Sequence, residues 1–195
     1  MTVISTYIDL LRHGEVEGGS CYRGITDDPL SSKGWIQMHS KVASQLGWDI
    51  IISSSLSRCY AFAYALAEKQ QCQLIASPGL QEINFGDWEG KTAAQIDPQL
   101  LAQFYTDPVH FTVPNGEQFI DFRQRILKSW QALIRTHKGK RILLITHAGV
   151  IRIILADILG MDTQHSFKLK IAHACFSSIE CFHDTKDFYQ LIRHG

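Results

Sequence analysis

The chain has 195 residues, of which 45% are hydrophobic and 19% are charged, a composition typical of globular proteins and unlike that of disordered or membrane proteins. Basic and acidic residues number 19 each, so the formal net charge is zero and no overall positive field attracts nucleic acid or an anionic membrane. We therefore expect neither partner, and we expect residues 1–195 to form a single domain with one core.

The cysteines and the amino terminus point to a reducing compartment. The five cysteines are odd in number and lack CxxC spacing, so we expect free thiols. The N-terminal run MTVISTYIDLL has no basic start and no small-residue cleavage site, so we interpret it as a strand and not as a signal peptide. The apolar helical run GVIRIILADILG is too short to span a bilayer. The sequence thus predicts a cytoplasmic protein.

Short β-branched runs alternate with longer helical runs along the chain, a pattern typical of a mostly parallel sheet with helices on both faces. The predicted strands are 6–11, 49–53, 73–76, 141–146, 177–182 and 188–193, and the predicted helices are 31–46, 56–70, 117–137 and 150–159. The polar turn HDTKD joins the last two strands, which predicts an antiparallel hairpin at the sheet edge. The expected fold is an α/β, three-layer α/β/α sandwich with a six-stranded, mostly parallel sheet and an antiparallel edge strand.

Two long segments are predicted as loops, and one of the predicted helices is amphipathic. Residues 15–30 and 82–114 are rich in loop-forming residues. Within 117–137, apolar side chains recur at intervals of three and four and form one buried stripe. Glu117 stands at the start of this helix, where we expect it to cap the helix rather than line a pocket.

Polar and charged residues follow three of the predicted strands, and the carboxyl ends of parallel strands meet at one edge of a sheet. Arg12 and His13 follow the first strand, Arg58 opens the helix after the second, and His147 follows the fourth. Arginine forks and helix N-termini both suit a phosphoryl group. The glycine after the first histidine, Gly14, is expected where the backbone turns sharply or approaches a ligand. The sequence therefore predicts a phosphate site.

A histidine in such a site can act as a nucleophile if it is neutral and its second ring nitrogen is held by an acceptor. Arg12 and Arg58 disfavour the imidazolium form of His13 and so favour the nucleophile. The leaving alkoxide also needs a proton donor. Three carboxyl groups in LQEINFGDWEG are candidates, and spacing alone does not choose among them: Glu82, Asp87 and Glu89.

The motifs LLRHGE, SSSLSRCYAFA, LQEINFGDWEG, PNGEQFIDFRQR and ITHAGVIR, in this order, resemble the histidine phosphatase (phosphoglycerate mutase-like) superfamily over essentially the whole chain. The resemblance implies catalytic roles for His13, Glu82 and His147, with a phosphohistidine intermediate on His13 and proton donation by Glu82. It also implies that Arg12, Arg58 and His147 hold the phosphate.

The segment HGEVEGGSCYRGITDDPLSSKGW resembles the α-ribazole phosphatase branch of that superfamily. The chain departs from the commoner pattern at Gly19, where an Asn often binds phosphate, and at Phe62, where a Thr is usual. We expect Phe62 to alter the packing beneath the site. Four residues of the first loop are candidates for substrate contacts, of which Tyr22 and Arg23 could equally brace a surface loop: Glu15, Ser20, Tyr22 and Arg23.

The resemblance implies a metal-independent phosphomonoesterase, with α-ribazole 5′-phosphate, an intermediate of cobalamin biosynthesis, as candidate substrate. A phosphoglycerate mutase, a sugar-phosphate phosphatase and an inactive phosphate-binding scaffold are the alternatives. His173 and Cys175 are the one metal-like pair considered, and since no further ligand set accompanies them we predict no metal and no cofactor. The expected partner is a small-molecule phosphate ester, and the sequence leaves a homodimer open.

The tripeptide Arg-His-Gly occurs twice, in LLRHGE at 10–15 and in LIRHG at 191–195. We expect the last strand to run opposite to the parallel set, which would place the second copy at the other edge of the sheet. We predict that His194→Ala keeps its phosphatase rate and that His13→Ala loses it. Phosphate release from p-nitrophenyl phosphate measures both rates, and an inactive His194→Ala protein that remains folded would contradict this prediction.

Overall fold

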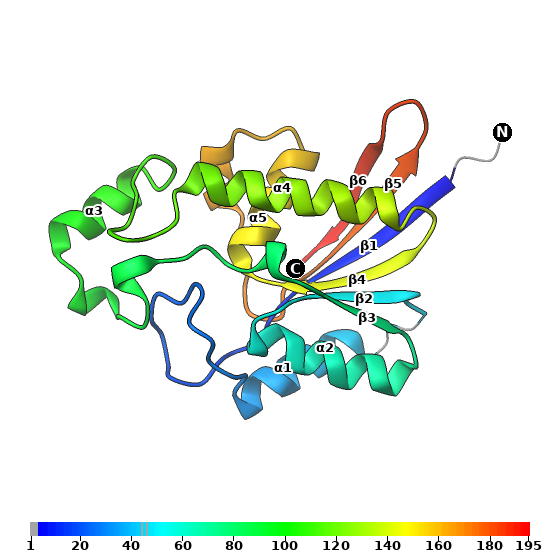
Figure 1. The fold of residues 1–195 in the computed structure, drawn as a ribbon, viewed down its shortest axis with the longest axis horizontal. Coiled ribbons are helices and arrows are strands. Elements are labelled where there is room, and N and C mark those ends of the chain that lie inside the picture. Colours follow the sequence, from blue (N-terminus) through cyan, green and yellow to red (C-terminus); the bar gives the residue numbers. More distant parts are fainter. Residues whose placement is uncertain (1–3, 44, 46) are drawn as a thin grey trace.

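A computed structural model describes residues 4–43, 45 and 47–195, in which a twisted six-stranded sheet is the central element (Figure 1). The strands are β1 (Ile4–Arg12), β2 (Ile50–Ser54), β3 (Gln73–Ser77), β4 (Arg141–Thr146), β5 (Phe176–His183) and β6 (Phe188–His194). The helices are α1 (Ser32–Val42), α2 (Ser57–Gln70), α3 (Pro98–Thr106), α4 (Phe119–Thr136) and α5 (Ala148–Ile158). Short 3₁₀ helices lie at Pro78–Leu80, Gly86–Trp88, Ala93–Gln95 and Thr163–Lys168.

The sheet has the order β3-β2-β4-β1-β5-β6. β2 pairs in parallel with β3 and β4, and β4 pairs in parallel with β1. β5 pairs antiparallel with β1, and β6 pairs antiparallel with β5. The predicted α/β class, the six strands and the antiparallel pairing at the edge are confirmed.

The direction of β6 differs from the expectation. Because β5 runs antiparallel to β1, the hairpin returns β6 to the direction of β1. The carboxyl end of β6 therefore lies at the same end of the strands as Arg12. The expected placement of Arg193 to Gly195 at the opposite edge is therefore wrong. His194 lies two strands away from β1, where its Nδ1 is 2.8 Å from the hydroxyl of Ser177. The prediction that His194→Ala keeps its phosphatase rate is therefore based on this hydrogen bond to Ser177, which is separate from the predicted phosphate site.

Helices cover both faces of the sheet (Figure 1). α1 and α2 pack on one face around Met38, Phe62 and Leu66, and α4 and α5 pack on the other. The apolar stripe predicted for the long helix is confirmed, since all six side chains are buried: Phe119, Phe122, Ile126, Trp130, Leu133 and Ile134. The helix predicted over 31–46 ends at Val42, and positions 44 and 46 lie outside the described residues.

The segment predicted as a long loop, 82–114, contains α3. Pro98 occupies the first turn, and the Asp97 side chain accepts hydrogen bonds from the N–H groups of Gln99 and Leu100. This Asp-Pro start is a helix signal that the sequence carried. α3 lies beyond the edge of the sheet (Figure 1), packed on an aromatic cluster around Trp88, Ile96 and Val113.

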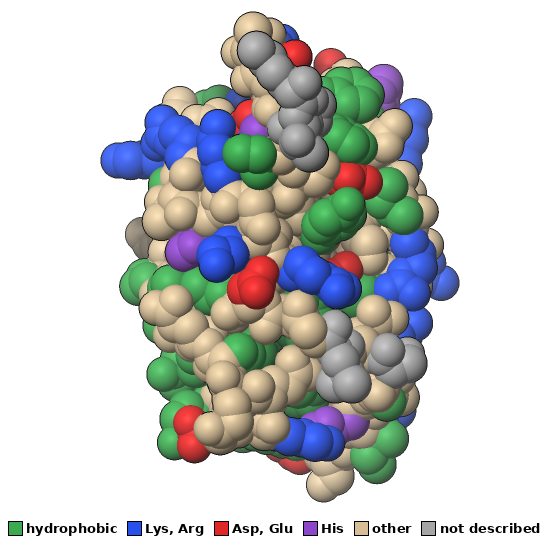
Figure 2. All heavy atoms as spheres, turned by 90° about the vertical axis from the view of Figure 1, so that its right-hand side faces the viewer, with side chains coloured by type: hydrophobic (Ala, Val, Ile, Leu, Met, Phe, Trp, Pro, Cys, Tyr) green, Lys and Arg blue, Asp and Glu red, His purple; other side chains and the backbone are tan. Residues whose placement is uncertain are grey.

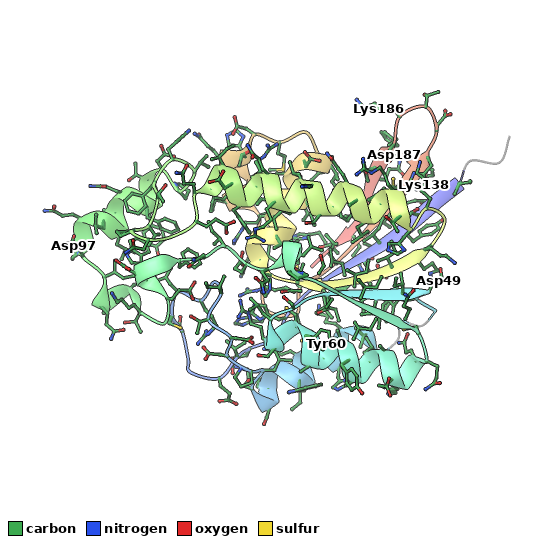
Figure 3. All side chains as sticks on the ribbon, viewed as in Figure 1. Asp49, Tyr60, Asp97, Lys138, Lys186 and Asp187 are labelled. Atoms are coloured by element: carbon green, nitrogen blue, oxygen red, sulfur yellow. The ribbon has the colours of Figure 1, made fainter. Side chains whose placement is uncertain are left out.

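The edge of the sheet at which β1 begins faces the viewer in Figure 2, where basic, acidic and hydrophobic side chains are interspersed. Asp187 and Lys138 lie near this edge (Figure 3), with their charged groups 4.0 Å apart. No helix in the described part of the chain is both long and apolar enough to cross a membrane.

The turn after β1 packs tightly against α1 through two glycines. A Cβ atom on Gly14 would lie 2.3 Å from the carbonyl oxygen of Gly34, and a Cβ on Gly34 would lie 2.0 Å from that of Glu15. Both contacts are with backbone atoms, so neither can be relieved by a side-chain rotation. Gly14 is thus required by helix packing, a reason that the sequence did not indicate.

Gly34→Ala should therefore lower the free energy of unfolding by about 2 kcal/mol or more, although alanine is the better helix former. Ser40→Ala, at an exposed position of the same helix, is the control and should change stability by less than about 0.5 kcal/mol. Urea unfolding measures both values. Equal stability of the two variants would show that the close approach does not constrain the fold.

Candidate active site

Residues that follow β1, β2 and β4 meet at one edge of the sheet. The N–H of His13 donates to the carbonyl oxygen of Thr146 at 3.0 Å, which fixes the ends of β1 and β4 together. The rings of His13 and His147 lie edge to face with their centroids 5.3 Å apart. Arg12 and Arg58 join them, as their positions after the strands predicted, and Glu82, which the strand ends did not single out, completes the group.

His13 is 6% exposed, and its Nδ1 lies 2.8 Å from the carbonyl oxygen of Gly14. A carbonyl oxygen only accepts, so Nδ1 carries the proton and Nε2 keeps its lone pair when the ring is neutral. Burial lowers the pKa of His13 well below its ordinary value, and the charges of Arg12 and Arg58 lower it further. His13 is consequently neutral at physiological pH.

Two arginine side chains lie beside this histidine without a counter-ion. Arg58 is fully buried and donates to the carbonyl oxygens of Thr26, at 2.7 Å, and Gly24. Arg12 donates to the carbonyl oxygen of Ile171 at 2.7 Å, and burial lowers its pKa despite the opposing charge of Glu82. Within the described residues neither guanidinium forms an ion pair, and the Nε of each is buried without a partner. Such uncompensated charge favours a bound anion.

His147 lies behind His13 and is fully buried. Its Nε2 is 2.7 Å from the hydroxyl of Ser54, and the thiol of Cys59 lies 3.7 Å from the same nitrogen. Burial, followed by the charge of Arg58, lowers the pKa of His147 well below its ordinary value. His147 is therefore also neutral and is fixed in orientation.

Glu82 is 9% exposed and lies at the N-terminus of α5. Its carboxylate accepts hydrogen bonds from the N–H of Gly149 at 3.0 Å and from that of Ile83 at 3.1 Å. A Cβ on Gly149 would lie 2.3 Å from a carboxylate oxygen, so the absence of a side chain there makes room for Glu82. The glutamate thus caps α5 and also faces the cavity described next.

An open, polar cavity of about 530 Å³ lies over His13. It has room for a phosphate and for a group several times larger than phosphate. Arg58, His147 and Gly14 do not line it. Its wall includes three of the predicted catalytic or phosphate-binding residues, three of the predicted loop contacts, and a histidine that was considered only as a metal ligand: Arg12, His13, Glu82, Glu15, Ser20, Arg23 and His173.

The other two candidate acids are placed elsewhere. Glu89 accepts hydrogen bonds from the backbone of residues 24–26 and 85, which ties two loops together. Although burial alone raises the pKa of Glu89, the hydrogen bonds from Thr26 and from the backbone lower it overall. Asp87 accepts from Asn115 at 3.0 Å. Of the three, Glu82 alone lines the cavity.

The first loop is braced by its own side chains. Arg23 pairs with Asp28 at 2.6 Å and donates to the carbonyl oxygens of Gly19 and Glu17. Glu15 pairs with Lys33 at 2.7 Å at the rim of the cavity. Gly19 has φ of 72° and an open space beside it.

Tyr22 and Phe62, two residues singled out from the sequence, face away from this cavity. The Tyr22 ring packs against Phe85 and Trp88, and its hydroxyl is 2.7 Å from that of Tyr105. Tyr22 is therefore not part of the wall. Phe62 is fully buried against Trp35 and His39 on the α1 side of the sheet.

Glu117 does not cap α4, contrary to the prediction. The helix begins two residues later, at Phe119, and the carboxylate of Glu117 instead pairs with Arg125 at 2.8 Å. Arg125 also donates to the carbonyl oxygens of Gln81 and Glu82. This ion pair thus holds the segment that carries Glu82, a longer-range contact than the local spacing could indicate.

Three potential metal ligands lie near the end of the sheet at which β1 begins, away from the cavity. Cys181, His183 and Asp187 place one ligand atom each within 4.8 Å of one another, and His183 Nδ1 is 2.8 Å from Asp187 Oδ1. β5 contributes Cys181 and His183, and the turn that precedes β6 contributes Asp187. His173 and Cys175, the pair considered from the sequence, do not belong to this group.

The buried neutral histidines predict a loss of stability in acid. Because the pKa of His13 and of His147 is lower in the folded than in the unfolded protein, protonation below about pH 6.5 favours the unfolded chain, and above that pH their effect is constant. The free energy of unfolding should therefore decrease as the pH is lowered from 7 to 5.5. Urea unfolding of His147→Asn should show about half of this loss, and an unchanged loss would contradict the assignment.

Comparison with known proteins places these features in a family. The model of the histidine phosphatase superfamily (branch 1) matches residues 8–194. The chain is 27% identical over 178 residues to the adenosylcobalamin/alpha-ribazole phosphatase of Escherichia coli K12, with 88% of each chain covered. It is 29% identical over 195 residues to the bifunctional protein Rv2228c of Mycobacterium tuberculosis, covering 96% of this chain but only 53%, about half, of that protein.

A solved structure gives the same result for the fold. The crystal structure of the alpha-ribazole phosphatase from Shigella flexneri superposes with a TM-score of 0.83 at 26% identity, covering 95% of this chain and 94% of that one. The family model spans the strand ends that carry both histidines, both arginines and the glutamate. The chain therefore belongs to the histidine phosphatase superfamily.

Proposed function

We propose that this protein is a metal-independent phosphomonoesterase in which His13 is the nucleophile. Nε2 attacks the phosphorus atom, so that an N–P bond forms as the ester P–O bond breaks. The neutral ring, with Nδ1 held by the Gly14 carbonyl oxygen at 2.8 Å, is the observation that carries the proposal. The phosphoryl group is thereby transferred from the alcohol to His13, which becomes a phosphohistidine.

Glu82 serves both steps of the proposed reaction. As a carboxylic acid it gives its proton to the leaving oxygen, and as a carboxylate it then takes a proton from water. That water attacks the phosphohistidine, the N–P bond breaks and inorganic phosphate leaves. The place of Glu82 in the cavity wall beside His13, fixed by the N–H of Gly149, supports this role.

Arg12, which lines the cavity, and the buried Arg58 and His147 stabilise the phosphoryl group in this proposal. The two guanidinium groups lack counter-ions within the described residues, and their charge balances the charge that spreads over the phosphoryl oxygens in the transition state. His147 adds a neutral ring that Ser54 orients.

The substrate that we propose is α-ribazole 5′-phosphate, a small-molecule phosphate ester. The relatives from Escherichia coli and Shigella flexneri are alpha-ribazole phosphatases, which supports this choice, and so does a cavity that exceeds phosphate in size. Steady-state phosphate release should be compared for α-ribazole 5′-phosphate, 3-phosphoglycerate, fructose 1,6-bisphosphate and a phosphopeptide. We expect the first ester to give the highest kcat/KM.

Two other results would contradict this proposal in different ways. Conversion of 3-phosphoglycerate to its isomer without phosphate release would indicate a mutase. Tight phosphate binding without turnover of any ester would indicate a phosphate-binding scaffold.

Gly149→Ala tests the position of Glu82. The added methyl group meets the carboxylate and displaces it from the N–H of residue 149, so kcat should fall by about 100-fold while the fold is retained. Gly160→Ala, just beyond the other end of α5, meets nothing within 4 Å but places a Cβ atom at a φ of 61°, so it should lower the stability and keep the kcat. A Gly149→Ala enzyme with the wild-type kcat would exclude this role for Glu82.

A further inference from the structure

We propose that His173 is a substrate-binding residue that recognises a hydroxyl group on the leaving alcohol of the ester, an inference that rests on the proposed phosphatase function. His173 lines the same cavity as His13, and the centroids of the two rings lie 5.8 Å apart with their planes tilted by 46°. When the phosphorus atom of an ester lies next to His13 Nε2, the leaving alcohol is therefore within reach of the His173 ring.

The backbone around His173 is tied to the end of β1 on both sides. The N–H of Ala174 donates to the carbonyl oxygen of His13 at 3.2 Å, and the N–H of Arg12 donates to that of Cys175 at 3.0 Å. The guanidinium of Arg12 also donates to the carbonyl oxygen of Ile171 at 2.7 Å. These three bonds fix the turn that carries His173 relative to the nucleophile.

The turn itself has an uncommon conformation. Ala174 has φ of 54°, in the left-handed region that a residue with a Cβ atom rarely adopts. The N–H of Cys175 donates back to the carbonyl oxygen of Ala172 at 3.0 Å and closes the turn over Ala174. The hydrogen bonds to β1 maintain this strain, and the result is a ring that lines the cavity.

The chemistry of the ring suits a hydroxyl group better than a phosphate. Burial and the charge of Arg12 lower the pKa of His173 to about 4, with a smaller opposing effect of Glu15, so the ring is neutral at physiological pH. A neutral imidazole has one N–H donor and one acceptor nitrogen, and an alcohol hydroxyl has one O–H donor and two acceptor lone pairs. Either group can therefore donate to or accept from the other. His173 is exposed in the cavity wall, so the hydrogen-bonding groups of its ring can reach a ligand.

The test compares two phosphate esters that differ in hydroxyl groups, ribose 5-phosphate and phenyl phosphate. In His173→Ala, kcat/KM for ribose 5-phosphate should fall about 10-fold, while that for phenyl phosphate should stay within about twofold of the wild type. His173→Asn, which keeps a donor and an acceptor, should recover part of the loss. His110→Ala removes a histidine that pairs with Asp107 outside the cavity and should change neither value.

Three results would overturn the inference. An equal loss for both esters would mean that His173 positions His13, and no loss would mean that it contacts no substrate. A wild-type enzyme that hydrolyses phenyl phosphate but not ribose 5-phosphate would also contradict hydroxyl recognition. If the wild type releases phosphate from neither ester nor from α-ribazole 5′-phosphate, the proposed phosphatase function fails, and this inference fails with it.

Discussion

The burial of two guanidinium groups, complete for Arg58 and partial for Arg12, next to a neutral histidine is the constraint on which the rest of the site depends. Among the described residues, Arg12 and Arg58 donate to backbone carbonyl oxygens and not to carboxylates, so their positive charge remains available. That charge and burial together keep the pKa of His13 low, which leaves a ring nitrogen unprotonated. One arrangement of charge thus prepares both the place for an anion and the nucleophile beside it.

The surrounding structure serves to keep these groups in place. The loop of residues 24–26 accepts hydrogen bonds from Arg58 and donates hydrogen bonds to Glu89, so a buried cation and a partly buried anion hold the same short segment. The Glu117–Arg125 pair fixes the backbone that carries Glu82. Positions that look peripheral in the sequence therefore determine where the proposed acid lies.

Much of this architecture could be predicted because it depends on local sequence. Alternating strands and helices gave the sheet, and residues at the carboxyl ends of β1, β2 and β4 meet because parallel strands end at one edge. What escaped prediction depends on long-range pairing. The direction of β6 follows from the pairing of β5 with β1, and the role of Glu117 follows from its contact with Arg125, which lies eight residues later in the chain. Neither relation leaves a periodic trace in the sequence.

His173 illustrates the same limit within the cavity. Its place beside His13 results from hydrogen bonds between the ends of β1 and the turn before β5, which are separated by more than a hundred residues. The helix α3 is the opposite case, since Asp97 and Pro98 form a local start signal within a region that we predicted to be loop.

The most direct measurement is to mix the enzyme with an excess of ³²P-labelled p-nitrophenyl phosphate, quench within milliseconds and locate the label. Our account predicts an acid-labile, base-stable phosphohistidine on His13 in the wild type, absent in His13→Ala. Turnover of the ester by the wild type without any labelled protein, or labelling of His13→Ala to the same extent, would contradict it.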